Sequence, residues 1–129
     1  MNGYLLDTSI ALTALTEPGS LSSTSRRAVL RGPNVLSVVL YWEVLLKSMK
    51  GSLDVGDPRA WWHDALEQLV ATPLPLRPEH VAGIYTLPPI HKDPFDRIFI
   101  AQAAAEGLAL VTGNDHMLLY GSAQLKVVC

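Results

Sequence analysis

The chain of 129 residues has the length of one domain, placed at residues 1–129, and its 49% apolar and 17% charged types exclude a disordered tail. It lacks the apolar run of about 18 residues that a membrane span needs and the basic-then-apolar start of a signal peptide, so we expect neither. A net charge of −2 excludes a protein that coats nucleic acid through bulk positive charge, but it does not exclude an enzyme that acts on nucleic acid. The single cysteine excludes a disulfide framework and favours a location in the cytoplasm.

Turn-forming residues divide the chain into short segments that alternate between strand and helix patterns. In chain order we predict a strand at 4–6, helices at 10–15 and about 23–30, a strand at 35–38, helices at 39–50 and 58–70, an extended segment at 74–76, helices at 78–85 and 94–106, and strands at 108–112 and 126–128. Asp57-Pro58 and Asp93-Pro94 are each a cap followed by proline, which is typical of a helix start. Strands alternating with helices predict an α/β domain, whose short and mostly parallel sheet has helices on both faces.

Two acidic positions follow predicted strands. Asp7 comes directly after the strand at 4–6, and Asn114-Asp115 follows the strand at 108–112. Ligands of open α/β sheets bind outside the carboxyl ends of the strands, so both positions lie on the edge where a site forms. Taken singly, Asp7 is equally well explained as a helix N-cap, and Asp115 is more typical of a turn.

Two further acids lie on predicted helices that are otherwise nearly all apolar. Glu43 shares a helix face with Lys47 and Lys50, which by itself favours a solvent-exposed stripe with a weakly stabilising Glu–Lys pair. Asp96 is the third residue of a helix capped by Asp93, where a capping box or attraction to the helix dipole is the structural explanation. That helix is expected to be buried, and a buried carboxylate needs a partner.

Together these acids are expected to converge on one cleft. Clustered carboxylates repel each other, and a divalent cation stabilises them. A donor set of oxygens, without His or Cys at metal-binding spacing, favours Mg²⁺ or Mn²⁺ over Zn²⁺. The four histidines form no H-x-x-x-H pattern, and His91 is expected in a loop.

Four sequence blocks, spread from about residue 4 to residue 128, carry a resemblance to a known family. They are Leu5-Leu6-Asp7-Thr8-Ser9, Ser37 through Trp42-Glu43 and Lys47 to Gly51, His91-Lys92-Asp93-Pro94-Phe95-Asp96-Arg97 with Ile100-Ala101-Gln102-Ala103, and Leu110-Val111-Thr112. In this order they resemble the PIN-domain proteins, most closely the VapC-type toxins of bacterial toxin–antitoxin pairs. The third block is quite specific.

The resemblance implies a compact α/β/α domain and a Mg²⁺- or Mn²⁺-dependent endoribonuclease that a cognate antitoxin inhibits. The first three acids of the family correspond to Asp7, Glu43 and Asp96. Asp7 and Asp96 are then expected to be the principal metal ligands, and Glu43 a ligand or the base that orients water.

The fourth acid of the family departs from the pattern. Members usually carry it two residues after the strand threonine, where this chain has Asn114, with Asp115 next. Either Asp115 substitutes through a small shift of the loop, or the site keeps three acids and an amide. We favour Asp115 as catalytic and metal-binding residue, because Gly113 makes the turn permissive, with Asn114 beside it on the rim.

Contacts to RNA are expected from hydroxyl and basic side chains. The candidates are Thr8, Ser9, Arg26, Arg27, Arg31 and Lys47. Thr8 and Ser9 would orient Asp7 or contact phosphate, whereas an ordinary solvated helix face explains the arginines equally simply. The three tryptophans and many leucines exceed what a small core comfortably holds, which predicts a homodimer.

Two other functions stay open. A PIN-fold module that binds RNA or a partner without cutting is favoured by Asn114, which lacks the charge of the usual acid. A phosphoacceptor domain fits Asp7 at a strand end, but no lysine follows a late strand in a suitable place. Metal-dependent RNA cleavage distinguishes the nuclease from both.

Overall fold

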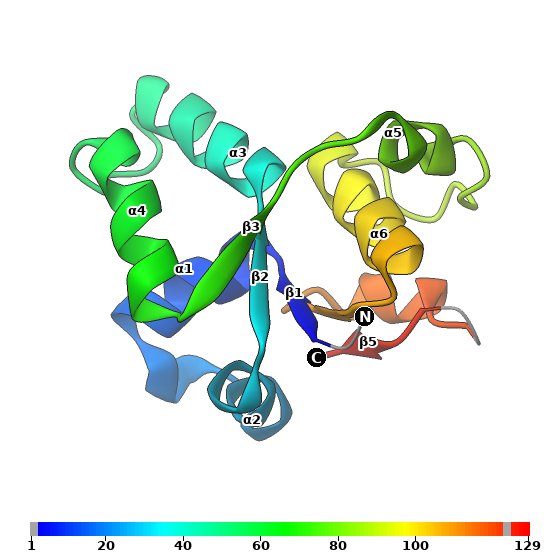
Figure 1. The fold of residues 1–129 in the computed structure, drawn as a ribbon, viewed down its shortest axis with the longest axis horizontal. Coiled ribbons are helices and arrows are strands. Elements are labelled where there is room, and N and C mark those ends of the chain that lie inside the picture. The colour runs from blue at the N-terminus through cyan, green and yellow to red at the C-terminus, as the bar shows by residue number, and fades with distance from the viewer. Residues whose placement is uncertain (1–2, 123–124) are drawn as a thin grey trace.

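Five parallel strands form one sheet in the order β3-β2-β1-β4-β5 in the computed structural model, which describes residues 3–122 and 125–129 (Figure 1). The strands are β1 (Tyr4–Leu6), β2 (Asn34–Ser37), β3 (Ala71–Leu74), β4 (Ala109–Val111) and β5 (Val127–Val128). The helices are α1 (Thr8–Thr16), α2 (Ser23–Arg31), α3 (Val38–Met49), α4 (Pro58–Gln68), α5 (Pro78–Ile84) and α6 (Pro94–Glu106), with 3₁₀ segments η1 (Pro18–Ser20) and η2 (Asp115–Tyr120). The α/β class with a parallel sheet is therefore confirmed.

The path of the chain reverses next to β1, the middle strand. It moves outward from β1 to β2 and β3, then crosses back to β4 and β5 on the other side of β1. Parallel crossovers are right-handed, so a reversal of direction places the later helices on the opposite face. Figure 1 shows this, with α1 and α4 on one side of the strands and α5 and α6 on the other. The carboxyl ends of β1 and β4 flank this switch point, where α/β folds bind ligands.

The local signals for helix starts are confirmed. Asp57 caps α4 by accepting the Arg59 N–H, and Asp93 caps α6 by accepting the Phe95 N–H. Gly107 ends α6 in the left-handed conformation, with φ of 66°. The bounds of α6 are those expected from the sequence, because cap, proline and terminal glycine all lie within a few residues of the ends they determine.

Two strand predictions were wrong. Val38 is the first residue of α3 rather than the end of a strand, because the Ser37 side chain caps the helix by accepting the Val39 N–H at 3.0 Å. The third strand runs over Ala71–Leu74 instead of 74–76. Among the described strands it pairs with β2 alone and forms an edge of the sheet, so Pro73 needs no N–H for a second neighbour.

The core lies between the sheet and its helices. Phe99 and Ile100 of α6 are fully buried, as are Leu5 and Leu6 of β1 and Leu110 of β4. These strands therefore have apolar side chains on both faces, as a covered parallel sheet requires. None of the helices among the described residues is long and apolar enough to cross a membrane.

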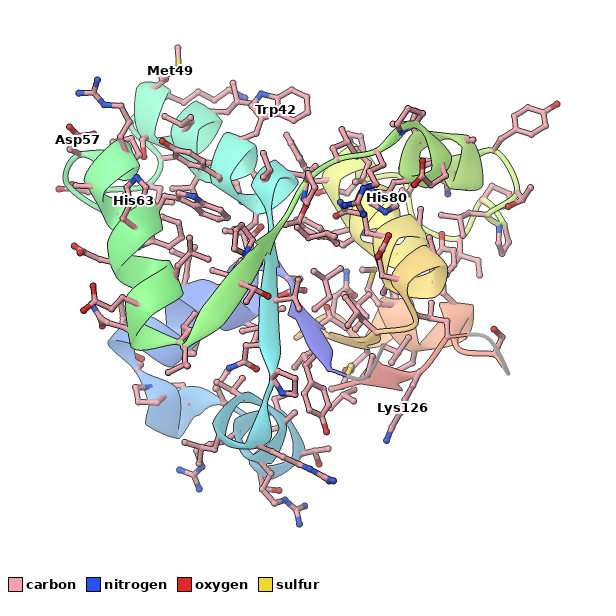
Figure 2. The ribbon with its side chains drawn as sticks, viewed as in Figure 1. Trp42, Met49, Asp57, His63, His80 and Lys126 are labelled. Carbon is pink, nitrogen blue, oxygen red and sulfur yellow. The ribbon has the colours of Figure 1, made fainter. Side chains whose placement is uncertain are left out.

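One buried polar pair joins α5 to α6. His80 has no solvent exposure, and Figure 2 shows its ring between the two helices. Its Nδ1 accepts the Arg77 N–H at 3.0 Å, so Nε2 carries the proton and donates to Glu106 Oε2 at 2.8 Å. This histidine has a structural role on the side of α6 that faces α5.

Candidate active site

Asp7 is both a helix cap and part of an acidic cavity. Its backbone N–H donates to the Val111 carbonyl at 3.0 Å, which holds the end of β1 against the end of β4. Its Oδ1 accepts the Ile10 N–H at 2.9 Å and so caps α1. The residue is only 5% exposed. The cap explanation is thus confirmed, and it leaves the carboxylate buried at the switch point of the sheet.

The electrostatic surroundings of Asp7 raise its pKa from the usual 3.8 to about 6. Desolvation by burial is the largest cause, and the negative charges of Asp96 and Glu43 add to it. Hydrogen bonds from the Thr112 side chain and the Ile10 backbone act in the opposite direction. The three carboxylates predicted to converge are therefore close enough to repel each other.

Glu43 is buried, not part of a solvent-exposed stripe. It is 6% exposed, and both carboxylate oxygens have partners. Thr8 Oγ1 donates to Oε1 at 2.5 Å, and Lys47 Nζ lies 2.9 Å from Oε2. The predicted Glu43–Lys47 pair is confirmed, but the exposure expected for Glu43 was wrong because α3 turns this face toward α1 and α6. Thr8 was expected to orient Asp7 or to contact phosphate, and its hydroxyl donates to Glu43 and not to Asp7.

Asp96 lies at the third position of α6, as predicted. Its carboxylate Oδ2 is 2.7 Å from Nε2 of His91, in the loop before the helix. The pKa of Asp96 is raised, chiefly by desolvation, and the negative charges of Asp93 and Glu43 act in the same direction, while the His91 hydrogen bond lowers it. Sequence reasoning placed His91 in this loop but missed its contact with Asp96. A histidine shortly before a capped helix start was the available signal.

The loop after β4 brings Asn114 to these acids. Its N–H donates to Thr112 Oγ1 at 3.1 Å, and its Oδ1 caps η2 by accepting the His116 N–H at 3.0 Å. Asp115, the first residue of η2, lines a neighbouring cavity of about 330 Å³ together with Thr13 and Cys129. The geometry therefore places the amide, and not the adjacent carboxylate, on the acidic side.

The site residues line one cavity of about 350 Å³ at the carboxyl edge of the sheet, which we call the acidic cavity. Its lining consists of Asp7, Thr8, Ser9, Leu12, Glu43, Lys47, Asp93, Asp96, Gly113 and Asn114. Among the described residues, Lys47 is the only lysine or arginine in this lining. Near its edge, ligand atoms of His91, Asp93 and Asp96 lie within 4.8 Å of one another, a second arrangement that could hold an ion.

The three arginines proposed for RNA contact lie elsewhere. Helix α2 ends at Arg31, immediately before β2 begins, so it lies at the amino edge of the sheet (Figure 1). Arg26 and Arg31 line a cavity of about 610 Å³ there, and Arg27 is exposed, with its Nε donating to the Ser23 carbonyl. None of them lines the acidic cavity. Their position fits a solvent-exposed helix face better than a role in binding RNA at the acidic cavity.

A family model for the PIN domain matches residues 4–121 of the chain. The chain belongs to the PIN domain family. No curated protein sequence matches it at a significant level. The matched range contains Asp7, Glu43, Asp96 and Asn114, which all line the acidic cavity. The cavity is therefore part of the PIN domain.

Solved structures share this PIN fold along nearly the whole chain. VapBC2 from Rickettsia felis, bound to a DNA fragment from its promoter, has a TM-score of 0.68 at 14% identity and covers 98% of this chain and 97% of its own. A toxin–antitoxin complex from Klebsiella pneumoniae has a TM-score of 0.64 at 20% identity, covering 95% and 94%. FitAcB from Neisseria gonorrhoeae has a TM-score of 0.64 at 18% identity and covers 96% of this chain and 95% of its own. At these identities the likeness establishes the fold.

Proposed function

We propose that this PIN domain is a Mg²⁺- or Mn²⁺-dependent endoribonuclease of the VapC type, the toxin of a toxin–antitoxin pair. The observation that carries the proposal is the convergence of Asp7, Glu43 and Asp96 on one cavity. They come from three separate parts of the chain and line one cavity at the switch point of the sheet, where Asp7 and Glu43 are buried and Asp96 is half-buried. Buried carboxylates without a binding role are costly, so a shared ligand is the simplest reason for the arrangement.

The donor set fits a hard divalent cation. Every acidic ligand in the cavity offers oxygen, which Mg²⁺ and Mn²⁺ prefer. The pKa of Asp7 is raised chiefly by burial, and the negative charges of Asp96 and Glu43 add to the shift, so a cation at this position would stabilise the ionised carboxylate. Asp7 and Asp96 are the principal candidate ligands, because Thr8 and Lys47 already engage both oxygens of Glu43. When bound, the cation would supply Lewis-acid stabilisation of the phosphate and an acidified water.

The remaining side chains act on the substrate and on the proton. Glu43, held in a fixed orientation by Thr8, is positioned to accept a proton from the attacking water. Lys47 and Asn114 line the same cavity and are our candidates for contact with phosphate oxygens. Ser9, also in the lining, offers a hydroxyl at its rim. Burial of Asp7 and Glu43 lowers the local dielectric and strengthens the interactions of these two carboxylates.

The partners follow from the same site and from one exposed surface. The similar structure from Klebsiella pneumoniae is described as a toxin–antitoxin complex, which supports a cognate antitoxin for this chain. An antitoxin arginine placed in the acidic cavity would pair with its carboxylates and block RNA. Trp42 of α3 is 50% exposed with its ring edge-on to Phe95, and Met49 at the end of the same helix is 80% exposed; Figure 2 shows both side chains at the surface. This apolar surface supports the homodimer.

The test is cleavage of a single-stranded RNA panel by purified protein with Mg²⁺ or Mn²⁺, with EDTA as the negative control. Asp96→Asn should abolish cleavage, because it removes a charged ligand at nearly constant volume. Metal-dependent cleavage that disappears in this variant supports the proposal. RNA binding without cleavage, unchanged by Asp96→Asn, would favour the non-cutting module that Asn114 suggests.

A further inference from the structure

A second cavity adjoins the acidic cavity. It has a volume of about 330 Å³ and lies between α1, the start of α2 and the loop that follows β4. Ser9 and Gly113 line both cavities. Ser9 Oγ lies 3.4 Å from the position that a Cβ of residue 113 would take, so the glycine keeps this boundary free of a second side chain. A chain bound in one cavity therefore lies directly beside the other.

Hydroxyl groups dominate the lining of this second cavity, which we call the hydroxyl cavity. Six of its lining residues carry one, namely Ser9, Thr13, Ser20, Ser22, Ser25 and Thr112. Some are already engaged, since Ser20 donates to Glu17 and the Ser22 oxygen accepts the Ser25 N–H. The Ser9 and Thr13 side chains make no hydrogen bond within the part of the chain that the structure describes. Each of these two hydroxyls offers a donor and an acceptor to a ligand.

The charge of the hydroxyl cavity disfavours a bound phosphate. Asp115 is the only acidic or basic side chain in the described lining, apart from the Cys129 thiol. Burial raises the pKa of that thiol, and the negative charges of Asp115 and Asp7 raise it further, so the thiol stays protonated and lies close to the Asp115 carboxylate. A lining with one carboxylate and no cation repels phosphate. It favours an uncharged group that donates N–H hydrogen bonds.

We propose that the hydroxyl cavity receives the base of the nucleotide beside the scissile phosphate, and that Asp115 selects guanine there. The inference rests on the proposed ribonuclease function and assigns its base preference. An RNA chain with a phosphate at the acidic cavity places the adjoining nucleotide next to the boundary formed by Ser9 and Gly113. The volume of about 330 Å³ is at the low end of ligand cavities, which span about 300–1000 Å³, and so suits a single nucleoside.

Guanine matches the carboxylate because of the donors on its Watson–Crick edge. Its N1–H and its exocyclic amino group point in the same direction, and the two oxygens of a carboxylate accept both. Adenine and cytosine have an acceptor nitrogen beside the amino group, and uracil has a carbonyl oxygen on each side of its N–H, so a carboxylate repels part of each edge. Asp115 is then a specificity-determining residue, and the Ser9 and Thr13 hydroxyls serve the remaining polar atoms of the nucleoside.

The test compares wild type with Asp115→Asn on short polyuridine RNAs that carry one guanosine, inosine, adenosine or cytidine. Inosine differs from guanosine only in lacking the exocyclic amino group. With Mn²⁺, wild type should cleave the bond beside guanosine with a kcat/KM at least about 10-fold above that beside inosine, and Asp115→Asn should reduce this ratio to about 1. Asp64→Asn, an exposed change on α4, is the charge-matched control and should keep the wild-type ratio.

Binding of the same RNAs, measured by fluorescence anisotropy with Ca²⁺ in place of Mn²⁺, separates this inference from the proposed function. A guanosine preference in binding that Asp115→Asn loses, with no cleavage of any RNA, would refute the nuclease and support the base site. Equal binding and cleavage of all four RNAs by wild type, or a guanosine preference that Asp115→Asn retains, would overturn the inference. The wild-type comparison needs no substitution, so it decides even where the variant does not fold. Wild type that binds none of the RNAs would overturn both.

Discussion

Asp7 makes the metal-free protein less stable as pH rises. The residue is 5% exposed, and the pKa of its carboxyl is raised from 3.8 to about 6, chiefly by burial. A group whose folded pKa exceeds its unfolded pKa contributes stability that is complete below the unfolded value and is lost as pH rises through the folded value. A shift of about two units corresponds to about 3 kcal/mol. The free energy of unfolding should therefore fall by up to about 3 kcal/mol between pH 4 and pH 7, from Asp7 alone.

Asp7→Asn isolates this effect, because asparagine keeps the volume and still caps α1 by accepting the Ile10 N–H. In urea unfolding with EDTA, the variant should match wild type near pH 4 and exceed it by up to about 3 kcal/mol at pH 7. Asp64→Asn, an exposed change on α4, is the control and should follow the wild-type profile. Parallel profiles for wild type and Asp7→Asn would refute the reasoning, since the buried charge would then cost nothing.

Three further outcomes are expected. Asp96→Asn should lower metal-dependent cleavage by at least about 100-fold with an unchanged circular dichroism spectrum, and full activity at saturating Mg²⁺ would contradict its assignment as a ligand. Asn114→Asp should tighten Mn²⁺ binding in calorimetry while Asp115→Asn leaves it unchanged, because Asn114, unlike Asp115, lines the acidic cavity. A loss of Mn²⁺ affinity in Asp115→Asn alone would show that Asp115 is the fourth acid of the site, as the sequence predicted. His80→Leu should lower the free energy of unfolding by about 2–4 kcal/mol, since it leaves Glu106 and the Arg77 N–H without the ring, and an unchanged urea midpoint would contradict that role.

The sequence by itself determined the local elements and the strand-end acid. Helix α6 could be predicted with its bounds because Asp93, Pro94 and Gly107 act on the backbone within one turn of the ends. Asp7 could be placed on the ligand-binding edge because the polar residue directly follows an apolar strand. These properties depend on neighbours a few residues away, so the order of side chains along the chain contains them.

Only the tertiary structure decided which side chains meet. Glu43 looked like one end of an exposed pair until the packing of α1, α3 and α6 buried it beside Thr8, 35 residues away in the sequence. The arginines of α2 had the right charge for RNA, yet the helix precedes β2 and so lies at the opposite edge. Asn114 and Asp115 are adjacent in the sequence, yet Asn114 caps η2 and lines the acidic cavity, whereas Asp115 lines the neighbouring cavity. Burial and convergence depend on how distant elements pack, and residue spacing carries no direct record of that packing.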